Sequence, residues 1–292
     1  MANHLLFVDT NILLDFYRVR RESGLTILKE IDGLHDRVIT TYQVEMEFKK
    51  NRQNAILESV KNLKNRDPVP HPAFLSESRS ADILSRRISD ANARIKGFRE
   101  RLKQVMAKPT THDPVYKVVQ RLFVDESPLN LTRKRKERQA IKRKALRRFL
   151  LGYPPRKASD TSIGDALNWE WIVYLANQTK KHVVIVSRDS DYGAEIDDSA
   201  YINDWLIQEF RDRVTKKRQL LLFNRLAPAL KLLEVKVTQE AEDEEKEVAK
   251  RREKTVGELW PETGSSEWIR KVNEIFGDTL PNRGTTVVDP LS

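Results

Sequence analysis

Apolar and polar positions alternate in blocks over the first and last parts of the chain, and each block predicts a strand or a helix. Leu5 to Val8 is a short apolar run of the length typical of a buried strand. Asp9 follows directly, and we expect Thr10 and Asn11 to cap the next helix. A carboxylate at the carboxyl end of a buried strand lies where open α/β sheets bind their ligands. The plainer interpretation is that Asp9 only caps a turn.

The same order, a short apolar strand followed by acids, recurs further along the chain. Val183 to Val186 is a second apolar strand, and Ser187, Asp189 and Asp191 follow it. Further periodic segments predict helices at 22–31, 43–51, 162–177, 203–210 and 226–233, and strands at 38–41 and 219–223. Strands that alternate with helices indicate an α/β fold with a mostly parallel sheet covered on both faces.

The middle of the chain has few strand signals and dense charge. We expect helices at about 53–65, 79–107, 113–124 and 132–150. The longest should bury a stripe made of Ile83, Ile88, Ile95, Phe98 and Leu102. We therefore divide the chain into a core (1–52 and 150–236), a basic helical insert (53–149) and a tail (237–292). The tail should hold a charged helix at 239–254 and an amphipathic helix that includes Trp268 and Phe276.

The amino-acid composition limits the classes of function that the chain can have. The chain carries 53 Lys and Arg against 43 Asp and Glu, a net charge of +10, which indicates a polyanionic partner. There is no cysteine, so disulfides, thiolate zinc sites and cysteine nucleophiles are excluded. No apolar run has the length of a membrane span or a secretory signal, and we expect a cytoplasmic protein that does not bind membranes.

The most basic stretch runs from Arg133 to Arg148 and contains a single acid, Glu137. Most charge runs are solvated helix faces. Like charges one turn apart repel, however, and a nearby phosphate backbone would offset that repulsion. We expect this helix to contact nucleic acid, with Arg147, Arg148, Arg156 and Lys157 steering the strand.

Several acids follow buried strands or open helices in the predicted core: Asp9, Glu45 or Glu47, Asp165, Asp189 and Asp191. If they converge at one sheet edge they repel each other, and a hard cation with oxygen ligands would relieve that repulsion. Mg²⁺ or Mn²⁺ in such a site activates water and stabilises the charge that develops when a phosphodiester is displaced.

These motifs are similar to those of the PIN domain family of metal-dependent nucleases. Phe7-Val8-Asp9-Thr10-Asn11 resembles the opening acid motif, and Glu47 the second acid. Gly164-Asp165-Ala166 resembles the third motif, and Ser187-Arg188-Asp189-Ser190-Asp191 the closing pair. The resemblance covers about 4–52 and 150–235. The block between them is similar to the insert of larger PIN-like proteins, in which an Asn-Arg pair follows the second acid, as Asn51-Arg52 does here.

The resemblance implies a three-layer fold around a mostly parallel sheet, and cleavage of RNA or single-stranded nucleic acid that depends on Mg²⁺ or Mn²⁺. It implies that four acids hold the metal: Asp9, Glu47, Asp165 and Asp189. Asp191 would be an additional ligand or a supporting acid. Thr10 or Asn11 would position Asp9 or a phosphate, Ser187 would support the pocket, and Arg52 would contact nucleic acid.

Some alternatives stay open. Glu45 and Glu47 face about 200° apart on one helix; the motif favours Glu47, and the alternative is that Glu47 is only a solvated acid. A phosphatase of the haloacid dehalogenase kind needs an Asp where Asn11 stands. A nucleic-acid-binding module with a degenerate or partner-activated site is a further alternative. A role as a toxin or defence effector, and a protein partner bound through the tail or insert, are hypotheses.

Overall fold

The computed structural model describes residues 4–61, 63–124, 127–155, 162–197 and 199–259. The chain divides into two compact units, Met1–Lys246 and Glu247–Ser292. The first unit contains the sheet and the acids considered below.

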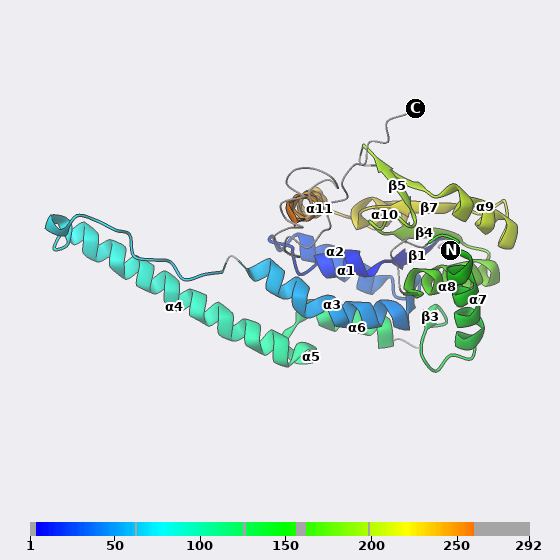
Figure 1. The fold of residues 1–292 in the computed structure, drawn as a ribbon, viewed down its shortest axis with the longest axis horizontal. Helices are drawn as coiled ribbons and strands as arrows, with labels where there is room; N and C mark the ends of the chain where they lie inside the picture. Colours follow the sequence, from blue (N-terminus) through cyan, green and yellow to red (C-terminus); the bar gives the residue numbers. More distant parts are fainter. Residues whose placement is uncertain (1–3, 62, 125–126, 156–161, 198, 260–292) are drawn as a thin grey trace, which may run out of the picture. The chain divides into compact units, whose positions relative to one another are not determined.

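A five-stranded parallel sheet forms the centre of the first unit, in the order β3-β2-β1-β4-β7 (Figure 1). The strands are β1 (His4–Val8), β2 (Val38–Thr41), β3 (Asn130–Leu131), β4 (His182–Val186) and β7 (Leu220–Phe223). Consecutive side chains of β1 and β4 are buried although they point to opposite faces, so helices cover both faces of the sheet. The predicted α/β fold with a parallel sheet is confirmed.

The connections between strands are helical. The helices of the first unit are α1 (Thr10–Asp15), α2 (Gly24–Gly33), α3 (Tyr42–Val60), α4 (Arg79–Ala107), α5 (Pro109–His112), α6 (Pro114–Val124), α7 (Arg138–Leu151), α8 (Gly164–Thr179), α9 (Asp204–Arg213) and α10 (Leu226–Leu232), with a 3₁₀ turn at Ala73–Leu75. The predicted helices in 79–107, 113–124 and 162–177 are confirmed within one or two residues at most ends. Asn203 caps α9 as its sequence indicates.

Two helix starts differ from the prediction. Asp9 caps α1 and Thr10 is its first residue, so the expectation that Thr10 and Asn11 form the cap was wrong. The helices predicted at 43–51 and 53–65 are one continuous helix, α3, capped by the hydroxyl of Thr41, which accepts from the Val44 N–H (3.2 Å). No helix-breaking residue separates them, so the hydrogen-bond ladder continues.

A small antiparallel hairpin, β5 (Gly193–Ile196) and β6 (Ser199–Ile202), was not predicted. The side chains of Glu195 and Ile196 are both exposed, so this segment lacks the alternation of buried and exposed positions that predicts a strand. At Gly193 an added Cβ would lie 2.0 Å from the backbone oxygen of Tyr201, so only glycine fits this close approach.

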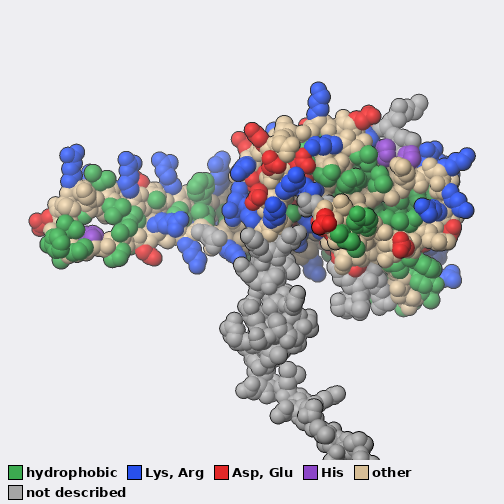
Figure 2. Space-filling model, turned by 90° about the horizontal axis from the view of Figure 1, so that it is seen from above, with side chains coloured by type: hydrophobic (Ala, Val, Ile, Leu, Met, Phe, Trp, Pro, Cys, Tyr) green, Lys and Arg blue, Asp and Glu red, His purple; other side chains and the backbone are tan. Residues whose placement is uncertain are grey.

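Helix α4 contradicts the expected apolar stripe, because none of its side chains is buried. Ile83 is 50% and Phe98 59% exposed, and hydrophobic side chains are visible on the surface of this segment in Figure 2. The extended segment 63–72 runs back along the helix: the Asn92 side chain bonds both the N–H and the carbonyl of Arg66. An amphipathic pattern identifies a distinct face but not what covers it.

The rest of the predicted insert packs on the sheet. Val119 of α6, Leu131 of β3 and Ala145 of α7 are fully buried in the same core as β1 and β4. The proposed boundaries at residues 53, 150 and 237 stay a prediction.

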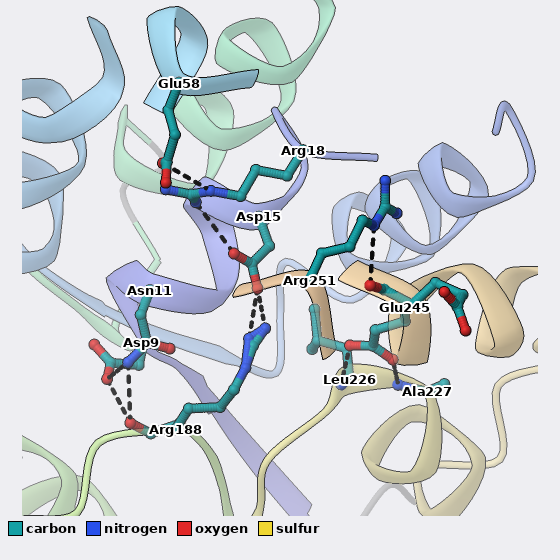
Figure 3. Close-up of polar contacts among 12 residues, drawn as sticks. Asp9, Asn11, Asp15, Arg18, Glu58, Arg188, Leu226, Ala227, Glu245 and Arg251 are labelled. Carbon is teal, nitrogen blue, oxygen red and sulfur yellow. Dashed lines mark hydrogen bonds and ion pairs between the residues drawn. The ribbon is translucent and has the colours of Figure 1, made fainter. Parts of the chain in front are cut away.

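Helix α11 (Gln239–Leu259) confirms the charged helix predicted at the start of the tail. Its first turns contact the core through acids: Glu245 accepts hydrogen bonds from the N–H groups of Leu226 (2.5 Å) and Ala227 (2.8 Å), drawn in Figure 3, and Glu244 accepts one from the N–H of Arg20 (2.8 Å). The second predicted tail helix lies outside the described residues. In the described part of the chain, every helix is too short or too polar to cross a membrane.

Candidate active site

Asp9 lies at the point where the two central strands end together. Its backbone N–H donates to the carbonyl of Val186 (3.0 Å), which ties the end of β1 to the end of β4. The residue is 5% exposed, and its carboxylate accepts three hydrogen bonds: from the N–H of Thr10 (2.6 Å), from the amide of Asn11 (2.8 Å, Figure 3) and from the hydroxyl of Ser187. These donors hold the carboxylate in one orientation.

Ser187 joins Asp9 to the acids that follow β4. Its hydroxyl donates to Asp9 and accepts from the N–H of Asp189 (3.0 Å). The same loop continues to Asp191, which is buried. The structure therefore joins Ser187 to Asp9 by a hydrogen bond and brings Asp189 and Asp191 to the same end of the sheet; the supporting role of Ser187 stays a prediction.

Glu47 enters from the second turn of α3. It accepts hydrogen bonds from the hydroxyl of Thr10 (3.1 Å) and the amide of Gln43 (2.7 Å). Glu45 instead pairs with Lys49 (2.6 Å) on the other side of the helix. The structure thus brings Glu47 next to Asp9 and leaves Glu45 away from it, and the choice of Glu47 as the second acid stays a prediction that this placement supports.

Asp165 lies in the first turn of α8, where the helix dipole favours a negative charge. The preceding residue, Gly164, lets this turn approach α3 closely. A Cβ at Gly164 would lie 2.7 Å from Nε2 of Gln43 and 2.8 Å from Oε1 of Glu47. The missing side chain therefore makes room for the side chains of Gln43 and Glu47.

The acids influence one another electrostatically. The pKa of Asp165 is raised to about 8; burial is the largest cause, and the charges of Asp9, Asp189, Glu47 and Asp191 contribute in that order. The pKa of Asp9 is raised to about 6: burial is the largest cause, the charges of Asp189 and Glu47 also raise the pKa, and the Ser187 hydrogen bond lowers it. All five acids predicted from the sequence therefore act on one small region.

This donor set fits a hard divalent cation. It consists of carboxylate oxygens, and their mutual repulsion is what a cation would relieve. In the conformation described, hydroxyl and amide donors occupy the oxygens of Asp9 and Glu47, and within the described ranges no three His, Cys, Asp or Glu side chains are already arranged as metal ligands. The chemistry of the donors fits the ion, and their present hydrogen bonds show what a ligand would have to replace.

Two arginines expected to contact nucleic acid do not reach solvent. Arg148 is 4% exposed, and it pairs with Glu170 (3.0 Å) and Glu209 and donates to the carbonyl of Pro154. This placement corrects the expectation, because the guanidinium is already neutralised inside the protein.

Arg52 is corrected for the same reason. It is buried, pairs with Asp113 (2.7 Å) and donates to the carbonyl of Val105 (2.7 Å). Arg147 is exposed on α7 and stays available. Arg156 and Lys157 lie outside the described residues.

An ion-pair chain beside the site was missed by sequence reasoning. Arg188, which precedes Asp189, pairs with Asp15 at the end of α1. Asp15 also pairs with Arg18 (3.1 Å), and Arg18 pairs with Glu58 of α3 (2.6 Å), as Figure 3 shows. This series of ion pairs fixes the loop after β4 to α1 and α3. Its sequence signal is an acid, Asp15, in an otherwise apolar helix turn.

Comparison with known proteins agrees with this architecture. A family model described as a PIN-like domain matches residues 5–192. No curated protein and no solved structure matches the chain significantly. Because the family match spans more than half of the sequence, the chain belongs to the PIN-like domain family.

Proposed function

We propose that this protein is a nuclease that cleaves phosphodiester bonds, with RNA as its favoured substrate and Mg²⁺ or Mn²⁺ as its cofactor. PIN-like domains are generally nucleases that use divalent metals. The observation that carries the proposal is the gathering of five acids at the ends of β1 and β4, because buried acids side by side stabilise the fold poorly and suit a cation well; the raised pKa of Asp165 agrees with it.

In this proposal Asp9, Glu47, Asp165 and Asp189 hold the ion, and Asp191 is a further ligand or a supporting acid. When bound, a divalent cation lowers the pKa of water and neutralises charge on the phosphodiester. The protein's own residues orient the carboxylates and keep them from adopting other conformations.

The supporting residues each have a defined task. Ser187 and Asn11 fix the carboxylate of Asp9, while Thr10 and Gln43 fix that of Glu47. Supporting partners of this kind typically change metal affinity or activity about 10–100-fold when removed. The buried acids repel a phosphate when no cation is present, so substrate binding and cation binding should favour each other.

The first test is cleavage of labelled single-stranded RNA and DNA in Mg²⁺, Mn²⁺ or EDTA, with Asp9→Asn beside the parent chain. We expect cleavage that requires metal and is lost in Asp9→Asn, while binding is kept or strengthened because one negative charge has gone. Glu45→Gln is the matched control for Glu47→Gln and should cut normally. An Asp9→Asn protein that cuts at the parent rate would refute this site.

A second candidate is a nucleic-acid-binding module whose acidic site a partner must activate. One observation favours it: the carboxylates of Asp9 and Glu47 are held by protein donors and not as a ready metal site. Binding without cleavage in every metal would support it. A role as a toxin or defence effector is a further proposal; expression of the parent chain but not of Asp9→Asn should then arrest growth.

A further inference from the structure

Helix α4 carries a line of arginines along one side. Arg79, Arg86, Arg87, Arg94 and Arg101 recur about every two turns, which places them within one arc of about 100° on the helix surface. All five are exposed. In Figure 2, Lys and Arg side chains project at intervals along one side of this segment. The five are called the arginine face below.

The arginine face is not used inside the protein. Among the described residues, none of its five members makes an ion pair, although Asp90 lies in the same arc. The opposite side of α4 is used: Arg99 donates to the carbonyl of Leu63 (3.1 Å) and Asn92 bonds the backbone of Arg66. One side of the helix therefore serves the fold and the other presents uncompensated positive charge.

This segment holds much of the charge of the whole protein. Residues 63–108 contain eleven Lys and Arg against five Asp and Glu, a net charge of +6 out of +10 for the chain. Arginines that repeat along one face repel each other and weaken a helix that no core supports. A polyanion lying along the face would remove this penalty.

The base of α4 is fixed close to the acidic site. Arg52 of α3 donates to the carbonyl of Val105 (2.7 Å) and pairs with Asp113, which in turn accepts from the hydroxyl of Tyr17 (2.8 Å). Arg101 lies four residues before Val105. Glu47 lies five residues before Arg52, about 7.5 Å along the axis of α3. The inner end of the arginine face is thus anchored to the helix that supplies the second acid.

We propose that the arginine face of α4 binds the phosphate backbone of the nucleic acid that enters the acidic site; the inference deepens the proposed nuclease function and rests on it. From Arg79 to Arg101 the face is about 33 Å long. Phosphates of one strand of a duplex are about 3.4 Å apart along its axis, so about ten nucleotides lie alongside the face. Arginine suits this contact because its fork of N–H donors matches phosphate oxygens.

The composition of the face favours nucleic acid over a membrane. A membrane surface would need several apolar side chains among the cations, and Ile83 is the one large, clearly exposed apolar residue within the described arc. An acidic protein would offer irregular charge, whereas the arginines repeat regularly along the helix axis.

The test measures binding without cleavage, in the Asp9→Asn background. Five Arg→Gln substitutions remove the arginine face. The control removes five exposed cations elsewhere, at Lys29, Lys180, Arg211, Lys216 and Lys217. Fluorescence anisotropy with a labelled 30-nucleotide RNA, and with DNA of the same length, gives Kd from 50 to 400 mM KCl. Circular dichroism checks that both variants keep the helical content of the parent.

We expect the arginine-face variant to bind about 10–100-fold more weakly at 100 mM KCl, with a salt slope shallower by about 3.5 for a single strand, and the control to change less than threefold. Equal losses in both variants would overturn the inference, and so would parental affinity in the arginine-face variant. Binding of the parent to phosphatidylserine vesicles but not to RNA or DNA would also overturn it.

The outcome is separable from that of the proposed function. If the active chain never cleaves but binding depends on the arginine face, the nuclease proposal fails and this inference stands. If the active chain cleaves and binding is independent of the face, the inference fails and the nuclease proposal stands.

Discussion

Replacing Asp9 by Asn should make the metal-free protein progressively more stable relative to the parent as pH rises, with a net gain near neutral pH. The folded state raises the pKa of Asp9 from 3.8 to about 6, so the folded state holds this proton more tightly than the unfolded state does. Between these two values the folded state binds more protons, and the free energy of unfolding therefore falls as pH rises. Asn has no such proton, so the variant lacks this loss.

The size follows from the two pKa values. The destabilisation that ionised Asp9 brings is below about 1 kcal/mol at pH 4 and about 3 kcal/mol at pH 7.5, because each pKa unit is worth about 1.4 kcal/mol. The amide exchanges one acceptor for a donor that faces the amide of Asn11, which costs about 1–2 kcal/mol at every pH. The stability difference between variant and parent should thus rise by about 2 kcal/mol from pH 4 to pH 7.5.

Urea unfolding in EDTA at several pH values, followed by circular dichroism, measures this difference. Asp36→Asn, at an exposed acid away from the site, is the matched control and should show no such rise. A difference that does not change with pH would refute the claim that Asp9 is destabilised by burial and by its acidic neighbours. Adding Mn²⁺ at pH 7.5 should stabilise the parent far more than the variant.

Two further predictions follow from placement. Arg148→Met leaves Glu170 buried with one cation fewer and should destabilise the fold by about 3–5 kcal/mol, whereas Arg147→Met on the exposed face should change the unfolding midpoint little. Glu47→Gln should lower the cleavage rate at least a hundredfold while Glu45→Gln keeps it, and equal rates in single-turnover assays would remove Glu47 from the site.

Local chemistry was enough to predict most helices and four of the strands, β1, β2, β4 and β7, but not the short β3 or the β5–β6 hairpin. Val38 to Thr41 is β-branched throughout and forms β2 with those bounds. Asp9, Asp165 and Asp189 could be proposed as neighbours because the carboxyl ends of β1 and β4, and the first turn of α8, meet at one edge of a parallel sheet. Because β1 and β4 pair in parallel, the residues that follow each strand in the sequence could be predicted to lie close together.

The predictions for Arg148 and Arg52 were wrong because the burial of each side chain depends on partners far away in the sequence. Arg148 stands in a run of cations, but the acids that neutralise it come from α8 and α9, 22 and 61 residues further along. Arg52 is paired with Asp113, which lies beyond the whole of α4. A run of like charges shows the sign of a segment but not which member turns inward, since that depends on what the other helices supply.

Gly164 carries a consequence for how activity is inferred from motifs. The atoms nearest to a methyl group at this position would belong to the side chains of Gln43 (Nε2 at 2.7 Å, Cγ at 3.2 Å) and Glu47 (Oε1 at 2.8 Å), so Gly164→Ala would displace these two side chains. The carboxylate of Glu47 would then leave its place beside Thr10. A natural variant that keeps all five acids can therefore lack activity, and a count of its carboxylates would not reveal the loss. Position 164, where this chain has a glycine, is the one to inspect first.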